Sequence, residues 1–108
     1  MKLLLILVLI TLSLAFTPPA LAADTANGAK IFSVQCAGCH INGGNIIRRG
    51  KTLKLKALKR NGVDSLETIT SLVAIGKNNM PGYKDRLNEK QIEDVATYVL
   101  EQAEQDWR

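Results

Sequence analysis

The last third of the chain has the clearest pattern of apolar and polar positions. Five apolar residues lie at intervals of three or four, with polar residues between them: Ile92, Val95, Ala96, Val99 and Ala103. This spacing is typical of an amphipathic helix that buries one face. Asn88 and Gln91 form a capping-box pair, so we predict that this helix begins at Asn88.

Three shorter helices are predicted upstream, separated by segments without periodicity at 41–50 and 77–87. The first is expected over Asp24–Gln35, and the second over Leu53–Arg60 with Thr52 as its cap. The third is expected to start at the capping pair Asp64 and Glu67 and to stop at Gly76. Its apolar stripe consists of Leu66, Ile69, Leu72 and Val73. No segment alternates in the manner of a strand. The pattern therefore predicts an all-α fold of about four helices.

The N-terminal segment has the pattern of an export signal. Lys2 precedes the uncharged stretch Leu3–Phe16, two prolines follow, and Ala20-Leu21-Ala22 supplies the small residues that a signal peptidase requires. The stretch is shorter than the roughly 20 residues that span a membrane. We expect residues 1–22 to be a cleaved signal peptide and 23–108 to be the mature domain, without stable membrane insertion. An uncleaved anchor is the alternative.

A domain of this size has little interior and often depends on a bound group for stability. Its two cysteines lie too close in sequence to close a useful loop. The formal net charge is +4, and Arg48 to Arg60 carries seven basic side chains and no acidic one. We interpret that run as a solvated face or as a docking surface for an electron-transfer partner. The low aromatic content and the predicted export argue against nucleic-acid binding.

The central motif is Cys36-Ala37-Gly38-Cys39-His40. C-x-x-C-H is the attachment pattern of c-type haem, in which two cysteines form thioethers with the porphyrin edge and the histidine ligates the iron. A thioredoxin-like redox pair would need a βαβ pattern, and a zinc site would need four ligands. A Cys36–Cys39 disulfide would leave His40 unexplained. We therefore predict one covalently bound haem c.

The second axial ligand follows from the small number of candidates. Electron carriers use His/His or His/Met ligation, and His40 is the only histidine in the chain. Met80 is the only methionine after the predicted signal peptide, and Pro81 restrains the backbone that follows it. Core packing of Met80, with lysine, tyrosine or an open site at the iron, is the alternative.

These motifs, taken together, resemble a known family. The resemblance covers nearly all of residues 23–108 and lies in Asp24–Phe32, the haem motif, Gly43-Gly44-Asn45, Lys51–Lys54, Lys77–Pro81 and Gln91–Val99. All of them look like cytochrome c6. The resemblance implies a class I cytochrome c fold, with four helices around one haem and the first and last helices crossing. In that fold Gly28 and Phe32 would meet Tyr98.

The resemblance also implies a function. Proteins of this family are monomeric one-electron carriers and not enzymes. They act in the thylakoid lumen or periplasm, between the cytochrome b6f complex and photosystem I or a cytochrome oxidase. Arg86 matches a family arginine implicated in docking to photosystem I, although Lys84 and Asp85 replace two glycines beside it.

One departure bears on the redox potential. Leu72 stands where photosynthetic members have a glutamine beside the methionine ligand, and a leucine cannot donate a hydrogen bond there. Loss of one polar interaction of about 1 kcal/mol corresponds to about 50 mV for one electron. The pattern is similar to the divergent c6B and c6C branches. It favours a lower potential and, as the alternative function, a low-potential redox sensor or a carrier outside the main photosynthetic chain. Tyr83 also replaces the usual phenylalanine after the methionine loop.

Overall fold

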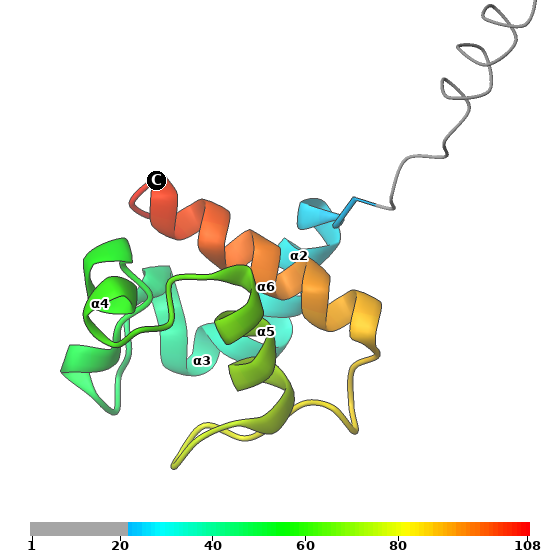
Figure 1. Cartoon of the computed structure of the whole chain (residues 1–108), viewed down its shortest axis with the longest axis horizontal. Helices are drawn as coiled ribbons and strands as arrows, with labels where there is room; N and C mark the ends of the chain where they lie inside the picture. Colours follow the sequence, from blue (N-terminus) through cyan, green and yellow to red (C-terminus); the bar gives the residue numbers. More distant parts are fainter. Residues whose placement is uncertain (1–21) are drawn as a thin grey trace, which may run out of the picture.

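The computed structural model describes residues 22–108 (Figure 1). The predicted signal peptide lies outside this part of the chain, apart from Ala22. The helices are α2 (Thr25–Ile31), α3 (Ala37–His40), α4 (Leu55–Arg60), α5 (Leu66–Ile75) and α6 (Glu89–Glu104). Residues 22–108 form no strand, and their one isolated bridge joins Lys77 to Met80. The predicted all-α fold is confirmed. None of the described helices is long and apolar enough to span a membrane.

The first helix is longer than its pattern predicted. Asp24 caps α2 by accepting a hydrogen bond from the Asn27 backbone N–H. The helix continues through a π-helical turn over Phe32–Cys36 into α3, so the C-x-x-C-H motif lies on helical backbone. Such wide turns inside helices are frequently found at functional sites.

The first and last helices cross at Gly28 (Figure 1). A Cβ atom at Gly28 would clash with the Asp94 carbonyl group and lie 2.9 Å from the Cβ of Tyr98. The Phe32 ring lies 5.5 Å from the Tyr98 ring, centroid to centroid. The predicted contact of Gly28 and Phe32 with Tyr98 is therefore confirmed, and glycine is what permits the close approach.

A buried carboxylate fastens the same crossing. Asp94, which is 2% exposed, accepts hydrogen bonds from the Asp24 backbone N–H at 2.8 Å and the Asn27 amide at 3.0 Å. Lys90, one turn earlier in α6, forms an ion pair with it. Burial raises the pKa of Asp94, but the hydrogen bonds from Lys90, Asn27 and Asp24 outweigh burial and hold it below its ordinary value.

The caps of the two middle helices differ from the predicted ones. Thr52 is not the cap of α4, which begins after Lys54 without a side-chain hydrogen bond. Asp64 is not the cap of α5, because Ser65 takes that position and forms a reciprocal capping box with Thr68. Gly76 ends α5 as predicted, with a φ of 78°.

The last helix follows its pattern closely. Asn88 and Gln91 form the expected capping box, and the five apolar residues of its stripe are all buried. In α5, Ile69 and Val73 are buried, but Leu66 is 37% exposed, so the predicted stripe is one residue too long at its start. The buried core joins these helices: Phe32, Leu58, Ile69, Val73, Tyr83, Ile92, Val95, Ala96, Val99 and Ala103.

Candidate functional site

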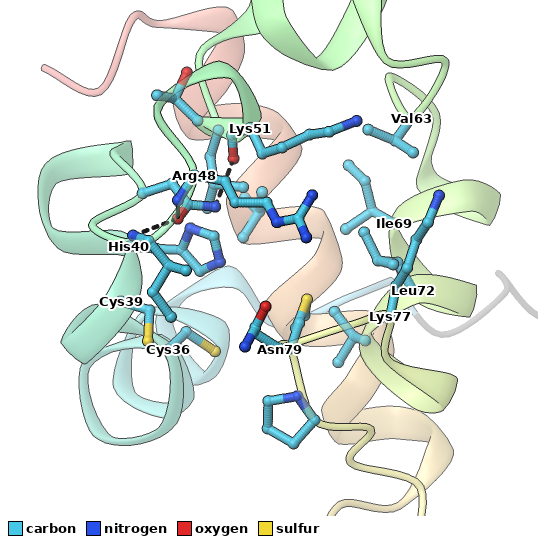
Figure 2. Close-up of a pocket in the computed structure, with 18 of the residues that line it drawn as sticks. Cys36, Cys39, His40, Arg48, Lys51, Val63, Ile69, Leu72, Lys77 and Asn79 are labelled. Carbon is cyan, nitrogen blue, oxygen red and sulfur yellow. Dashed lines mark hydrogen bonds between the residues drawn. The ribbon is translucent and has the colours of Figure 1, made fainter.

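A cavity of about 460 Å³ lies between α3, the 41–53 segment, α5 and the loop after α5 (Figure 2). Its lining is mostly apolar and includes Phe32, Leu58, Ile69, Leu72, Val73, Val95 and Val99. In Figure 2, Cys36, Cys39 and His40 lie on one side, and Leu72 and Lys77 lie on the other. The structure thus brings the predicted haem-attachment residues and Met80 to one cavity.

The two cysteines lie at the edge of the cavity and are not joined by a disulfide. Cys36 is half-buried and Cys39 is exposed. Burial raises the pKa of the Cys36 thiol to about 11. A catalytic thiol of the thioredoxin kind needs a lowered pKa. The environment of Cys36 therefore disfavours the hypothesis of a thioredoxin-like redox pair.

The His40 ring is held by a backbone carbonyl. Its Nδ1 lies 2.8 Å from the Gly44 oxygen, which can only accept, so Nδ1 carries the proton and donates. Nε2 is then left as a lone-pair donor on a ring that lines the cavity. This is the tautomer of a metal-ligating histidine with an oriented ring.

The segment after His40 turns sharply and is organised by Asn45. Asn42 and Gly43 adopt positive φ angles of 53° and 77°. The Asn45 side chain accepts hydrogen bonds from the backbone N–H groups of Ile47 and Arg48, and donates to the Lys51 carbonyl at 3.0 Å. Two motif residues that sequence reasoning used only for the resemblance, Gly43 and Asn45, therefore shape one wall of the cavity.

Met80 is presented by a tight backbone loop. Lys77 and Met80 exchange two backbone hydrogen bonds of 3.0 and 2.9 Å. A Cβ at Gly76 would lie 2.5 Å from the Met80 oxygen, and one at Gly82 would lie 2.5 Å from the Ile75 oxygen. The loop therefore folds back against the end of α5 at two glycines, and Met80 is half-buried in the cavity wall.

Tyr83 connects this loop to the first helix. Its hydroxyl donates to the Gln35 carbonyl at 3.0 Å, and its ring lines the cavity. The Arg86 guanidinium lies over the outside of the same ring, 5.2 Å from the centroid. Arg86 itself is exposed and does not line the cavity. Sequence reasoning noted Tyr83 only as a replacement, because nothing in the local pattern indicates a partner as distant as Gln35.

The residues around the cavity fit a haem. An apolar lining suits a flat hydrophobic macrocycle, and the Cys36 and Cys39 thiols stand at its edge. A nitrogen and a thioether sulfur, from His40 and Met80, are a donor pair that haem iron accepts. Arg48 extends its guanidinium towards the cavity, where a carboxylate could be neutralised (Figure 2). An all-helical fold closed around such a cavity defines a c-type cytochrome.

Comparisons with known proteins identify the family within this class. Residues 23–99 match the family model described as "Cytochrome C oxidase, cbb3-type, subunit III". A "Cytochrome c6-like" protein of Nostoc sp. (strain PCC 7120) is 62% identical over 108 residues, which is all of this chain and 96% of that one. The chain belongs to the cytochrome c6 family and has one covalently bound haem c.

Two solved structures agree with this assignment. Cytochrome c6B from Synechococcus sp. WH8102 has a TM-score of 0.73 at 54% identity, covering 76% of this chain and 93% of that chain. Cytochrome c6C from Synechococcus sp. PCC 7002 has a TM-score of 0.73 at 53% identity, covering 75% and 99%. The predicted likeness to the c6B and c6C branches is confirmed. The protein is a haem electron carrier.

Proposed function

We propose that the protein carries one electron at a time on a haem attached through Cys36 and Cys39, with His40 and Met80 as the axial ligands. The bound haem iron supplies the one-electron couple. The observation that carries the proposal is that His40, with Nδ1 engaged by Gly44, and Met80 line the same apolar cavity. If His40 and Met80 both bound the iron, no position would remain for a substrate, which would suit a carrier rather than an enzyme.

The remaining cavity residues would tune the potential. The Gly44 carbonyl accepts a hydrogen bond from His40 Nδ1–H, which makes the imidazole a stronger electron donor to a metal. The apolar side chains that line the cavity would exclude water from the iron and so disfavour the ferric state, which carries one more positive charge than the ferrous state. Arg48 would neutralise a haem carboxylate from the side that the 41–53 segment covers.

The proposed partners follow from the family. They are the cytochrome b6f complex as donor, and photosystem I or a cytochrome oxidase as acceptor, in the thylakoid lumen or periplasm. Export would depend on the 1–22 signal peptide, and the mature protein would be a monomer. Arg86, exposed and stacked on the cavity-lining Tyr83, is the proposed docking residue. The exposed basic residues of 48–60 supply a further surface for an acidic partner.

Absorption spectroscopy of the purified mature protein tests the ligand set. The oxidised protein should show the methionine-to-iron charge-transfer band, and Met80→Ala should abolish it while the haem stays covalently attached. Lys84→Ala, at an exposed position outside the cavity lining, is the control and should keep the band. A band that survives Met80→Ala would refute the methionine ligand. A colourless, correctly matured wild-type protein would refute the proposal as a whole.

The second candidate function, a low-potential sensor or a carrier outside the main chain, is favoured by Leu72. This side chain is half-buried in the cavity lining that Met80 shares. Leu72→Gln should raise the midpoint potential by about 50 mV, the equivalent of one hydrogen bond of about 1 kcal/mol. Leu72→Met, an apolar control of similar size, should leave the potential nearly unchanged in the same equilibrium redox titration. A wild-type potential equal to that of ordinary family members would rule this function out.

A further inference from the structure

The C-terminal end of the chain packs against the cavity wall through Trp107. After α6, Asp106 and Trp107 both adopt a φ of 57°, which turns the chain back on itself. The Trp107 ring then lies 5.2 Å from Phe32 and 6.0 Å from Tyr98, centroid to centroid. In Figure 1 the C terminus lies on the same side as α4. The indole is thus a contact between the end of the chain and the middle of it.

Trp107 holds both ends of the segment from Gly43 to Leu53. Its indole N–H donates to the Leu53 carbonyl at 2.9 Å. Its ring covers Gly43 so closely that a Cβ there would lie 2.5 Å from the indole Cγ. Leu53 and Gly43 are themselves joined by a hydrogen bond from the Leu53 N–H to the Gly43 carbonyl, at 2.7 Å. The indole therefore reinforces a loop that the backbone hydrogen bond from Leu53 to Gly43 closes.

The residue next to Gly43 is the one that orients His40. The Gly44 carbonyl accepts a hydrogen bond from His40 Nδ1–H, with 2.8 Å between the nitrogen and the oxygen, and Gly43 is buried beneath the indole. A displacement of Gly43 would shift the Cα of Gly44 with it, because one planar peptide unit joins the two residues. The Gly44 carbonyl is the next group along the chain, so the position of the indole can influence the hydrogen bond at His40 Nδ1.

We propose that Trp107 is a positioning residue for the His40 imidazole, acting through Gly43, Gly44 and Leu53. The inference rests on the proposed function, since it matters only where His40 ligates the iron. A tryptophan that merely filled the core would stabilise the fold without setting the strength of the hydrogen bond at Nδ1. The two roles predict different measurements.

The test uses the mature haem protein and two substitutions at one position. Trp107→Phe keeps a ring against Gly43 and loses the hydrogen bond to Leu53, whereas Trp107→Leu loses both. Proton NMR of the reduced protein follows the exchange of the His40 Nδ1 proton with solvent. Exchange should be about tenfold faster in Trp107→Leu, the order of one net hydrogen bond, and intermediate in Trp107→Phe.

The midpoint potential provides an independent measurement. A weaker bond from Nδ1 to Gly44 makes the imidazole a poorer donor and stabilises ferric iron less. The potential should therefore rise in Trp107→Leu and rise less in Trp107→Phe.

Leu100→Ala is the control for a general loss of stability. Leu100 lies in α6 and packs against the core, so its truncation should ease global unfolding while leaving Nδ1 exchange and the potential at wild-type values. If Trp107→Leu also leaves both at wild-type values, Trp107 only fills space and the inference is overturned. If the wild-type protein shows no histidine-ligated haem, the proposed function fails, and the inference fails with it.

Discussion

The two sides of the cavity are built by different means. The histidine side, Cys36–Leu53, is held largely by side chains, among them the amides of Asn45 and Asn61 and the indole of Trp107. The methionine side, Gly76–Tyr83, is held by backbone hydrogen bonds and by the lack of a side chain at two glycines. The comparison indicates that the histidine side can be loosened gradually, one side chain at a time, except at Gly43, where the Trp107 indole leaves no room for a Cβ. The methionine side should tolerate almost no added atom at its glycines.

Among the substitutions that test this contrast, Gly76→Ala should reduce stability the most. A Cβ there would overlap the Met80 oxygen and the Gly82 nitrogen, and the φ of 78° is strained for alanine. We expect a loss of about 3 kcal/mol in the free energy of unfolding, with weakening of the methionine-to-iron band. Urea unfolding and absorption spectra measure both.

Gly50→Ala is the matched control on the histidine side, since nothing lies within 4 Å of its Cβ position. It should be nearly neutral. Equal effects of the two substitutions would contradict the contrast between the two sides.

Asp94→Asn tests a buried contact that belongs to neither side. The amide should cost about 2 kcal/mol, because one of the N–H donors that Asp94 now satisfies loses its acceptor. The methionine band should not change, so stability and ligation separate in this variant. Chemical unfolding at neutral pH gives the stability difference.

The stability difference between the wild type and Asp94→Asn should shrink as the pH falls. The pKa of Asp94 is held below its ordinary value of 3.8 in the folded state. Its carboxylate therefore stabilises the wild type fully above pH 3.8, and this stabilisation disappears as the pH falls through the folded-state pKa. The wild type should lose its advantage over Asp94→Asn only in that acidic range. An advantage that vanished between pH 5 and 7 would require another titrating group.

Asn45→Ala should loosen the histidine side by a smaller amount. Its side chain makes three hydrogen bonds to the backbone, all partly solvated. Water can replace them in part, so we expect a loss of about 1.5 kcal/mol. Exchange of the amide protons of Ile47 and Arg48, followed by NMR, locates the change. Asn79→Ala on the methionine side is the control, and a similar loss there would remove the distinction.

Tyr83→Phe should have the smallest effect. It removes the hydrogen bond from Tyr83 to the Gln35 carbonyl, which joins the methionine side to the first helix just before the histidine side, and leaves the ring in place. We expect a loss of about 1 kcal/mol in thermal or urea unfolding, with little change in the visible spectrum. A loss of the methionine band in this variant would show that the tyrosine hydroxyl, rather than the glycine loop, positions Met80.

The sequence predicted the features that depend on neighbours in the chain. The stripe of α6, the capping pair Asn88 and Gln91 and the stop at Gly76 all depend on residues within a few positions of each other. The cap assigned to Asp64 was wrong because the neighbouring Ser65 can also cap and takes that position. The cap assigned to Thr52 was wrong because α4 begins later, after Lys54, where no side chain caps the helix. The attachment of haem through Cys36 and Cys39, and its ligation by His40 and Met80, remain predictions.

The contacts that connect distant parts of the chain could not be predicted. The indole of Trp107 reaches a carbonyl 54 positions away, and the hydroxyl of Tyr83 reaches one 48 positions away. Backbone carbonyls have no signature in a sequence, so neither partner can be recognised from residue types. Gly43 could be recognised as part of a motif, but nothing in the sequence indicated that an indole covers it.

The Asp94 carboxylate also bears on when the chain can fold. It joins α6 to the backbone of Asp24, 70 positions earlier, so the first helix completes its polar contacts only after the last helix has been synthesised. Contacts of such long range form late and slowly. The two ends of a newly made chain can therefore dock only after nearly the whole chain has been synthesised.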